Sequence, residues 1–361
     1  MTTQNIDWNK EQSRIVNIMR FPLIYIVLVI HFLPPDFKPI SLTMEGMMPY
    51  TILSEMVSHN FGKIAVPCFF LFSGYFFFAK MQEWSSHFYL KQLRKRISTL
   101  LIPYLLWNIV FIIIPILKVL LFDKLGIAQH DSISYYLDNS LLYLMWLPVD
   151  LPLWYLRDLI CMTILTPVFF LYFNSLGRYG VLLFSLLYVF SDYLIDFPPG
   201  LASTSIFFFG IGAYMSLSGK NMLEFAFRHK SMAYILFFPT LFLSTYINNQ
   251  HEVYEVCVRI FVIVGIIAFT NVIYELSKNE RFSNMMIRLS PTVFFIFAFH
   301  ELYIKNWLKG LTYRTPLADS AWGMIVGWIL MPMAAAIICI GIYKLWKRLS
   351  PKSLAVMVGE R

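Results

Sequence analysis

The stretch RFPLIYIVLVIHF, residues 20–32, has the composition of a membrane helix, yet it begins with Arg20 and carries His31 near its end. The ten residues between them are uncharged, and only Tyr25 has a polar side-chain group. Their separation is close to three helical turns, about 16 Å of rise, so both side chains are expected on one helix face. An arginine near a helix end also commonly reaches lipid phosphates. However, ionisable groups inside such helices usually face the bundle interior or a water-filled cavity, which predicts a polar passage along this helix.

The composition of the whole chain places it in the membrane. Of 361 residues, 58% are hydrophobic and 14% are charged, whereas ordinary soluble domains are roughly 25% charged. Apolar runs recur near the ~20 residues that cross a bilayer as a helix. The sequence therefore predicts an all-α polytopic integral membrane protein with about ten transmembrane helices, at 18–33, 61–79, 99–121, 152–173, 180–196, 201–218, 231–247, 255–276, 289–308 and 321–345.

Domain organisation and orientation follow from linkers and loop charges. No Gly/Ser-rich or Pro-rich linker and no internal repeat divides the chain, which predicts a single domain over 1–361. Most of the 29 Lys and Arg residues fall in segments that are cytoplasmic if both termini are cytoplasmic, as the positive-inside rule favours. The net charge of +8 is then a topology signal, and no nucleic-acid partner is needed to explain it. The four cysteines lie inside spans without CxxC spacing, so we expect neither disulfides nor a metal site.

A basic loop precedes the third predicted span. The segment YLKQLRKRISTLLIPY, residues 89–104, carries Arg94, Lys95 and Arg96. Such residues often anchor a protein to anionic lipid. Guanidinium groups also match phosphate oxygens, which makes this loop a candidate site for a cytoplasmic polyphosphate.

The fourth predicted span opens with PLWYLRDLI, residues 152–160. Adjacent helical residues diverge by about 100°, so Arg157 and Asp158 need not pair with each other. Trp154 and Tyr155 fit either an interfacial aromatic belt or a substrate-binding surface. A buried polar network here is equally consistent with a structural role and with the lining of a substrate cavity.

The ninth predicted span contains FFIFAFHELYI, residues 294–304, and places His300 and Glu301 within the membrane. Two adjacent titratable groups at this depth are difficult to explain by packing, so we expect them in or beside an active site. Lys63 and Arg259 lie nearer to span ends, and either a site role or a structural role fits them.

Several motifs, taken in order, resemble the membrane-bound acyltransferases of the acyltransferase-3 type. The R-x10-H pattern of Arg20 and His31 is followed by VPCFFLFSGYFF (66–77) and RKRISTLLIPYLLW (94–107). PLWYL (152–156), FFFGIGAY (207–214) and LSPTVFFIFAFH (289–300) are similar to later family landmarks. Two features depart from the pattern: the match is looser upstream of Ser73-Gly74, and His-Glu stands where a lone His is commoner.

The resemblance implies an enzyme that transfers an acyl group, by default acetyl, from cytoplasmic acyl-CoA to a hydroxyl of an envelope glycan or a related sugar-containing acceptor. It implies donor binding by Arg20 and, more loosely, by Arg94, Lys95 and Arg96. His31 would be the general base, with Glu301, His300 or Asp158 orienting or stabilising it, and Arg157, Trp154 and Tyr155 would contact substrate. With the charge pattern, it implies a multi-pass protein of the bacterial inner membrane, surrounded by lipid. Acceptor identity, a covalent acyl-enzyme and a homo-oligomeric state are left open.

Two other classes are consistent with the residues. A proton-coupled transporter, or an exporter of a lipid-linked sugar, would use intramembrane Asp158, Glu301, His31 and His300 as proton relays. Against this class, no internal repeat of the kind common in transporters is present. A membrane scaffold protein for glycan assembly would tolerate loss of His31 and would not bind CoA.

Overall fold

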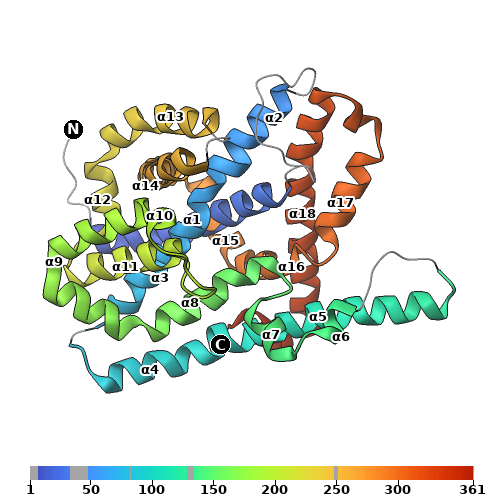
Figure 1. Cartoon of the computed structure of the whole chain (residues 1–361), viewed down its shortest axis with the longest axis horizontal. Coiled ribbons are helices and arrows are strands. Elements are labelled where there is room, and N and C mark those ends of the chain that lie inside the picture. Colours follow the sequence, from blue (N-terminus) through green and yellow to red (C-terminus); the bar gives the residue numbers. More distant parts are fainter. Residues whose placement is uncertain (1–6, 33–47, 82, 128–133, 248–250, 361) are drawn as a thin grey trace.

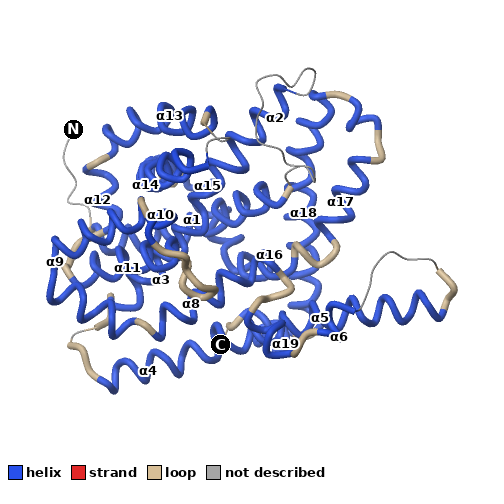
Figure 2. The backbone as a smooth tube through the Cα atoms, viewed as in Figure 1, coloured by secondary structure: helices blue, strands red, loops and turns tan. Residues whose placement is uncertain are grey.

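The computed structural model describes residues 7–32, 48–81, 83–127, 134–247 and 251–360 (Figures 1 and 2). Helices and the turns and loops between them account for all of these residues, and no strand occurs among them. The predicted all-α class is therefore confirmed.

Seven helices or continuous helical runs in the described residues are long and apolar enough to cross a membrane. They are α1 (Trp8–His31), the run Met48–Phe78, the run Ser86–Lys124, α9 (Thr166–Val189), α14 (His251–Leu276), the run Glu280–Phe299 and α18 (Ala321–Leu349).

Three of these runs contain several elements. The first contains α2 (Met48–Ser54), a π-helical turn η1 (Glu55–Asn60), a 3₁₀ turn η2 (Phe61–Ile64) and α3 (Ala65–Phe78). The second contains α4 (Ser86–Arg96), the π-helical turn η3 (Ile97–Leu101) and α5 (Ile102–Lys124); the third contains α15 (Glu280–Leu289), η5 (Ser290–Thr292) and α16 (Val293–Phe299).

The remaining elements are shorter. They are α6 (Ser134–Asp138), α7 (Leu141–Trp146), η4 (Leu151–Leu153), α8 (Trp154–Ile164), α10 (Ser191–Leu194), α11 (Ser203–Leu217), α12 (Met222–Arg228), α13 (Lys230–Tyr246), α17 (Ile304–Tyr313), η6 (Pro316–Asp319) and α19 (Pro351–Val358).

The predicted spans at 152–173 and 180–196 are separated in the structure by a kink at Gly177. α8 is followed by α9, in which two helical segments meet at this residue, whose dihedral angles are non-helical (φ 49°, ψ −127°). Glycine adopts a positive φ without the steric cost that a Cβ would impose, so the chain can turn at this point. The number ten and the cytoplasmic placement of the termini remain predictions.

The outward surface of α9 indicates its surroundings. Leu171, Leu182 and Leu186 are each at least half exposed, and only 11% of the most apolar window of this helix is buried within the protein. A contiguous leucine surface of this kind is unfavourable in water and favourable against lipid. The long apolar helices and their exposed leucines are those of a multi-pass membrane protein.

α1 lies in the interior of the bundle, where it packs against α3, α14, α15, α16 and α18 (Figure 1). Ile15, Ile18 and Met19 are almost completely buried, and Leu23 and Leu28 continue the buried surface toward the other end. This position places the two ends of α1 beside residues from distant parts of the sequence.

α3 and α11 approach each other at backbone distance. A Cβ atom on Gly74 would overlap the carbonyl oxygen of Phe209, and one on Gly212 would overlap that of Leu71. Small residues at helix contacts allow such close packing in membranes. The Ser73-Gly74 motif therefore has a packing function, and it fixes the position of α3.

The prediction of one continuous helix over 289–308 is wrong. α16 ends at Phe299, and a turn precedes α17. Tyr303 has φ 64°, the only positive φ of a non-glycine residue in the described part of the chain. The break matters because His300 and Glu301 lie in this turn, and interrupted helices in membranes commonly line sites or cavities.

Candidate active site

The His31 end of α1 meets the turn after α16. Nδ1 of His31 lies 2.8 Å from Oε1 of Glu301, and the ammonium group of Lys305 pairs with Oε2 of the same carboxylate. Since a carboxylate accepts hydrogen bonds, this contact favours the tautomer with the proton on Nδ1. Nε2 of His31 would then be the basic nitrogen.

His300 lies beside this pair and is fully buried. Its Nδ1 is 2.9 Å from the carbonyl oxygen of Ile296 and 3.0 Å from that of Phe297. Carbonyl oxygens only accept, so Nδ1 carries the proton and Nε2 is the acceptor. That Nε2 has no hydrogen-bond partner among the described residues and lies 3.9 Å from Oε1 of Glu301. The His31 and His300 rings are 4.9 Å apart at 61°, edge to face.

One donor atom from each of His31, His300 and Glu301 lies within 4.8 Å of the others, close enough to share a metal ion. The second oxygen of Glu301 is paired with the ammonium group of Lys305, however. A cation in this position opposes the binding of a second positive charge. The donor set therefore fits acid–base chemistry better than metal ligation.

The other end of α1 opens on a cavity of 380 Å³. Arg20, Arg96, Tyr155 and Ser73 contribute to its polar lining, and apolar side chains of α1, α3, α8 and α16 form the rest. Val27 and Phe297 also line it, each one helical turn before His31 and Glu301 respectively. The cavity therefore runs from two arginines to a point one helical turn short of the histidine–carboxylate pair, and His31 itself does not line it.

The structure separates the residues of the predicted basic site. Arg96 is partly buried, lines the cavity, and has a buried Nε without a hydrogen-bond partner among the described residues. Arg94 and Lys95 are exposed on α4 and do not line this cavity. Glu360, after α19, lines the cavity beside these arginines, and this contribution was not predicted.

Arg157 and Asp158 pair with each other, a contact that helical geometry left open. Nε and Nη2 of Arg157 lie 3.0 and 2.8 Å from Oδ1 of Asp158. A long arginine side chain can fold back across the 100° between neighbours, which the backbone argument did not consider. Oδ2 of Asp158 accepts hydrogen bonds from Ala202 N and Ser205 Oγ at 3.1 Å each. These bonds tie α8 to the start of α11, so the structure gives Asp158 a structural role.

The two aromatic residues before this pair differ in position. Tyr155 lines the cavity and packs against Phe70 and Phe297, with ring centroids 4.7 and 5.7 Å away. Trp154 packs on Phe70 at 6.2 Å and does not line the cavity. Of the two, only Tyr155 is therefore placed to contact a molecule in it.

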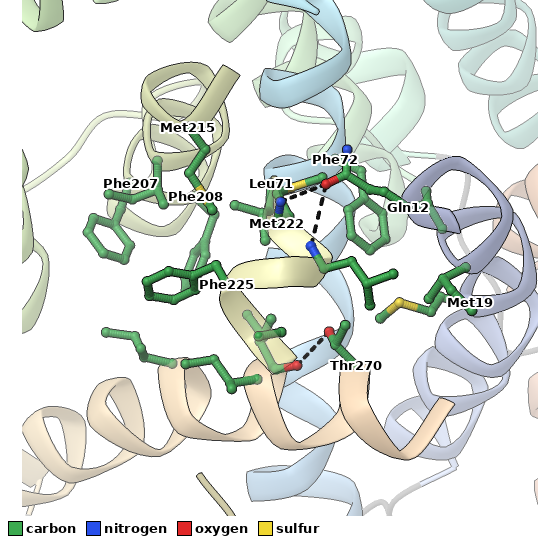
Figure 3. Close-up of a pocket in the computed structure, with 18 of the residues that line it drawn as sticks. Gln12, Met19, Leu71, Phe72, Phe207, Phe208, Met215, Met222, Phe225 and Thr270 are labelled. Carbon is green, nitrogen blue, oxygen red and sulfur yellow. Dashed lines mark hydrogen bonds between the residues drawn. The ribbon is translucent and has the colours of Figure 1, made fainter. Parts of the chain in front are cut away.

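A second cavity, of 240 Å³, is almost entirely apolar (Figure 3). Met19, Phe207 and Met215 are among its lining residues, and Val16 and Phe72 line both cavities. Gln12 reaches its rim but accepts hydrogen bonds from the backbone N–H groups of Met222 and Leu223, as Figure 3 shows. No titratable side chain lines this cavity, so we assign it no part in the chemistry.

Three residues near the site, Lys305, Asp150 and Glu360, were not predicted because little in the sequence marks them as site residues. Lys305 was counted only as a basic residue at a helix end, although it follows Glu301 by four residues, the spacing of helical ion pairs. Asp150 lies in a loop and belongs to no motif. Glu360 is remote in sequence from every other cavity residue.

A cavity with two arginines that approaches a partly buried histidine–carboxylate pair to within one helical turn is an arrangement suited to transfer of a group from an anionic donor. The chain belongs to the acyltransferase-3 family, whose model, described as an acyltransferase domain, matches residues 14–344. The protein is therefore an acyltransferase.

Among curated proteins, the chain is similar to the succinoglycan biosynthesis protein ExoH of Rhizobium meliloti (strain 1021). The two are 27% identical over 371 residues, which cover 96% of this chain and 92% of the relative. No solved structure matches the chain.

Proposed function

We propose that this protein is an integral-membrane O-acyltransferase that moves an acyl group, by default acetyl, from cytoplasmic acyl-CoA to a hydroxyl of an envelope polysaccharide. The observation that carries the proposal is the contact of His31 with Glu301 one helical turn beyond Val27 and Phe297, which line the cavity that also holds Arg20 and Arg96. The name of the relative, a succinoglycan biosynthesis protein, supports a polysaccharide acceptor.

The cavity suits the two chemical parts of acyl-CoA. Arg20 and Arg96 offer guanidinium groups for the CoA phosphates, and the unpartnered Nε of Arg96 is a donor that a phosphate oxygen would accept from. The apolar wall beyond Arg20, to which Ile24 and Val27 of α1 contribute, suits a pantetheine arm. The rise of about 16 Å between Arg20 and His31 is within the length of an extended arm.

In this proposal His31 is the general base. Nε2 takes the proton of the acceptor hydroxyl as its oxygen attacks the thioester carbonyl, and the imidazolium then returns a proton to the departing CoA thiolate. Glu301 holds the Nδ1 proton and stabilises the imidazolium, while Lys305 holds Glu301 in place. A positioned acid–base group of this kind contributes about 10²–10⁴ in rate.

Topology and location complete the proposal. With both termini cytoplasmic, the arginine end of α1 faces the compartment that contains acyl-CoA, and His31 lies toward the opposite side. The acceptor would then approach from outside, in the inner membrane of a bacterium.

Donor binding is tested by thermal unfolding of the detergent-purified protein with acetyl-CoA, and with dephospho-CoA as a control. A ligand present at 100 times its Kd raises the free energy of unfolding of the protein by about 2.7 kcal/mol. We expect stabilisation that is weaker in Arg96→Gln and retained in His31→Ala. Absence of stabilisation by acetyl-CoA and by succinyl-CoA, in folded protein, would contradict the proposal.

Transfer is tested with radiolabelled acetyl-CoA and succinoglycan from which alkali has removed the ester groups. We expect label in the polysaccharide with the wild-type protein and none with His31→Ala. Label that reaches the polysaccharide equally with both proteins would exclude His31 as the base.

A further inference from the structure

Asp150 is a buried carboxylate whose hydrogen-bonding capacity is unused. It is 1% exposed, and neither Oδ1 nor Oδ2 has a hydrogen-bond partner among the described residues. Its side chain does not cap η4, which it precedes; only its carbonyl oxygen is used, by Leu153 N at 3.0 Å. Buried polar groups without partners are rare and costly, so this carboxylate calls for a specific explanation.

The position of Asp150 links it to the active site. η4 packs against α16, whose end leads into His300 and Glu301. Glu301 and Lys305 are the charged groups that act on the Asp150 carboxyl. Burial raises the pKa of this carboxyl well above its usual range, and the charge of Glu301 raises it further. A carboxylate without hydrogen-bond donors therefore adjoins the element that leads into His300 and Glu301.

We propose that the Asp150 side chain binds hydroxyl groups of the acceptor sugar next to the reacting hydroxyl and so positions the acceptor over His31. The inference rests on the proposed function and specifies its acceptor as a polyol. A carboxylate can accept from two hydroxyl groups at once, because it has two oxygens with free lone pairs. The acceptor thus supplies the donors that the protein lacks here, and Asp150 recognises the acceptor without taking a proton in the reaction.

The other functions of a buried carboxylate are filled elsewhere in the described structure. Asp158 already ties α8 to α11, and Glu301 is already in contact with His31 and Lys305. Asp150 makes no comparable bond to another element. Replacement of a carboxylate that makes structural bonds lowers the free energy of unfolding. Replacement of an unpartnered buried carboxylate removes its desolvation penalty and does not lower that free energy, so the measured stability separates the two roles.

The test compares Asp150→Leu and Asp150→Asn with Asp138→Leu, which changes an exposed carboxylate in α6 of the same loop region. The probes are acetyl-CoA and de-esterified succinoglycan oligosaccharides. We expect Asp150→Leu to raise the oligosaccharide KM about 10- to 100-fold, the range of a hydrogen bond to a charged group. Asp150→Asn, which keeps hydrogen-bonding atoms, should fall between wild type and Asp150→Leu, and Asp138→Leu should match wild type.

Two further readouts make the result specific. In Asp150→Leu the Kd for acetyl-CoA should be unchanged, and the Tm should be equal to or above that of wild type. An unchanged oligosaccharide KM, or a lowered Tm with equal losses of donor and acceptor binding, would overturn the inference. Failure of the proposed function is distinguishable, because wild-type protein would then neither bind nor turn over acetyl-CoA, and both proposals would fall.

Discussion

Two histidine–carboxylate pairs lie near the His31 end of α1. His31 Nδ1 is 2.8 Å from Glu301 Oε1, and His59 Nδ1 is 3.0 Å from Glu55 Oε1. The first pair joins residues far apart in sequence across a break between helices. The second is an i,i+4 pair within the π-helical turn η1.

The surroundings of the two pairs differ more than their distances. The cavity that holds Arg20 and Arg96 reaches Val27 and Phe297, one helical turn before His31 and Glu301, although neither of these two residues lines it. No residue of η1 lines either cavity described above. The second pair adjoins a hydrogen-bonded network: Tyr254 donates to Asn60 at 2.9 Å, and Asn60 donates to Thr245 at 3.1 Å. A histidine–carboxylate contact alone thus does not identify a catalytic group. The first pair is distinguished by its position, one helical turn beyond the lining of the cavity that holds Arg20 and Arg96.

The largest expected effect separates the two histidines. His31→Ala should lower the transfer rate by about 10²–10⁴, the contribution of a positioned acid–base group. His59→Ala should change it less than about threefold, because no residue of η1 lines the cavity. Steady-state acetyl transfer at saturating acetyl-CoA measures both, and equal losses in the two variants would remove the distinction between the pairs.

The second largest effect on the transfer rate is expected at the Glu301 carboxylate. Glu301→Gln should lower the transfer rate by about 10²-fold, since the amide cannot stabilise the imidazolium as a carboxylate does. The acetyl-CoA Kd should stay unchanged, because Glu301 lies beyond the cavity end that holds the phosphates. A rise in Kd equal to the fall in rate would instead make Glu301 a binding residue.

The arginine end of the cavity gives a smaller effect with a matched control. Arg96→Gln should raise the acetyl-CoA Kd about tenfold, as expected for loss of one charge-assisted hydrogen bond. Arg94→Gln, two residues away and outside the cavity, should leave the Kd near that of wild type. The Kd is measured by titration calorimetry, and equal effects of both substitutions would indicate a diffuse basic surface.

The smallest effect on activity is expected at Glu55. This carboxylate is 0% exposed, so Glu55→Gln should lower the free energy of unfolding by about 1–3 kcal/mol through loss of a buried charged contact. The transfer rate per folded molecule should be unchanged. Thermal unfolding and a transfer assay on the same sample check this, and a loss of rate without a loss of stability would give the second pair a role in catalysis.

The sequence predicted the class of fold and the axis of the site, and both depend on simple regularities. Helical periodicity places Arg20 and His31 on one face, and membrane composition makes their presence informative. The partner of His31 could be named only as one of three residues, because contact between α1 and the turn after α16 depends on tertiary packing. The break after Phe299 was not predicted, because His300 and Glu301, which lie in it, were interpreted as site residues within a continuous span.

The remaining differences have equally specific causes. The sequence does not distinguish the three neighbouring basic residues Arg94, Lys95 and Arg96. In the structure only Arg96, the last residue of α4 before η3, lines the cavity. Asp158 belongs to a sequence motif, but its carboxylate forms hydrogen bonds to the start of α11. Asp150 lies in a loop outside every motif, and its carboxylate oxygens have no hydrogen-bond partner among the described residues. Side-chain bonding of this kind is decided by neighbours from other helices, which spacing along one helix does not reveal.

The backbone contact between α3 and α11 bears on how the protein is made. α3 enters the bilayer well before α11 is synthesised, so lipid chains must fill the groove at Gly74 until α11 displaces them. A larger side chain at Gly74 or Gly212 would leave insertion of each helix intact and block their final association. Because α3 also forms a wall of the cavity that holds Arg20 and Arg96, a molecule stalled at this stage would be fully inserted and yet lack that cavity.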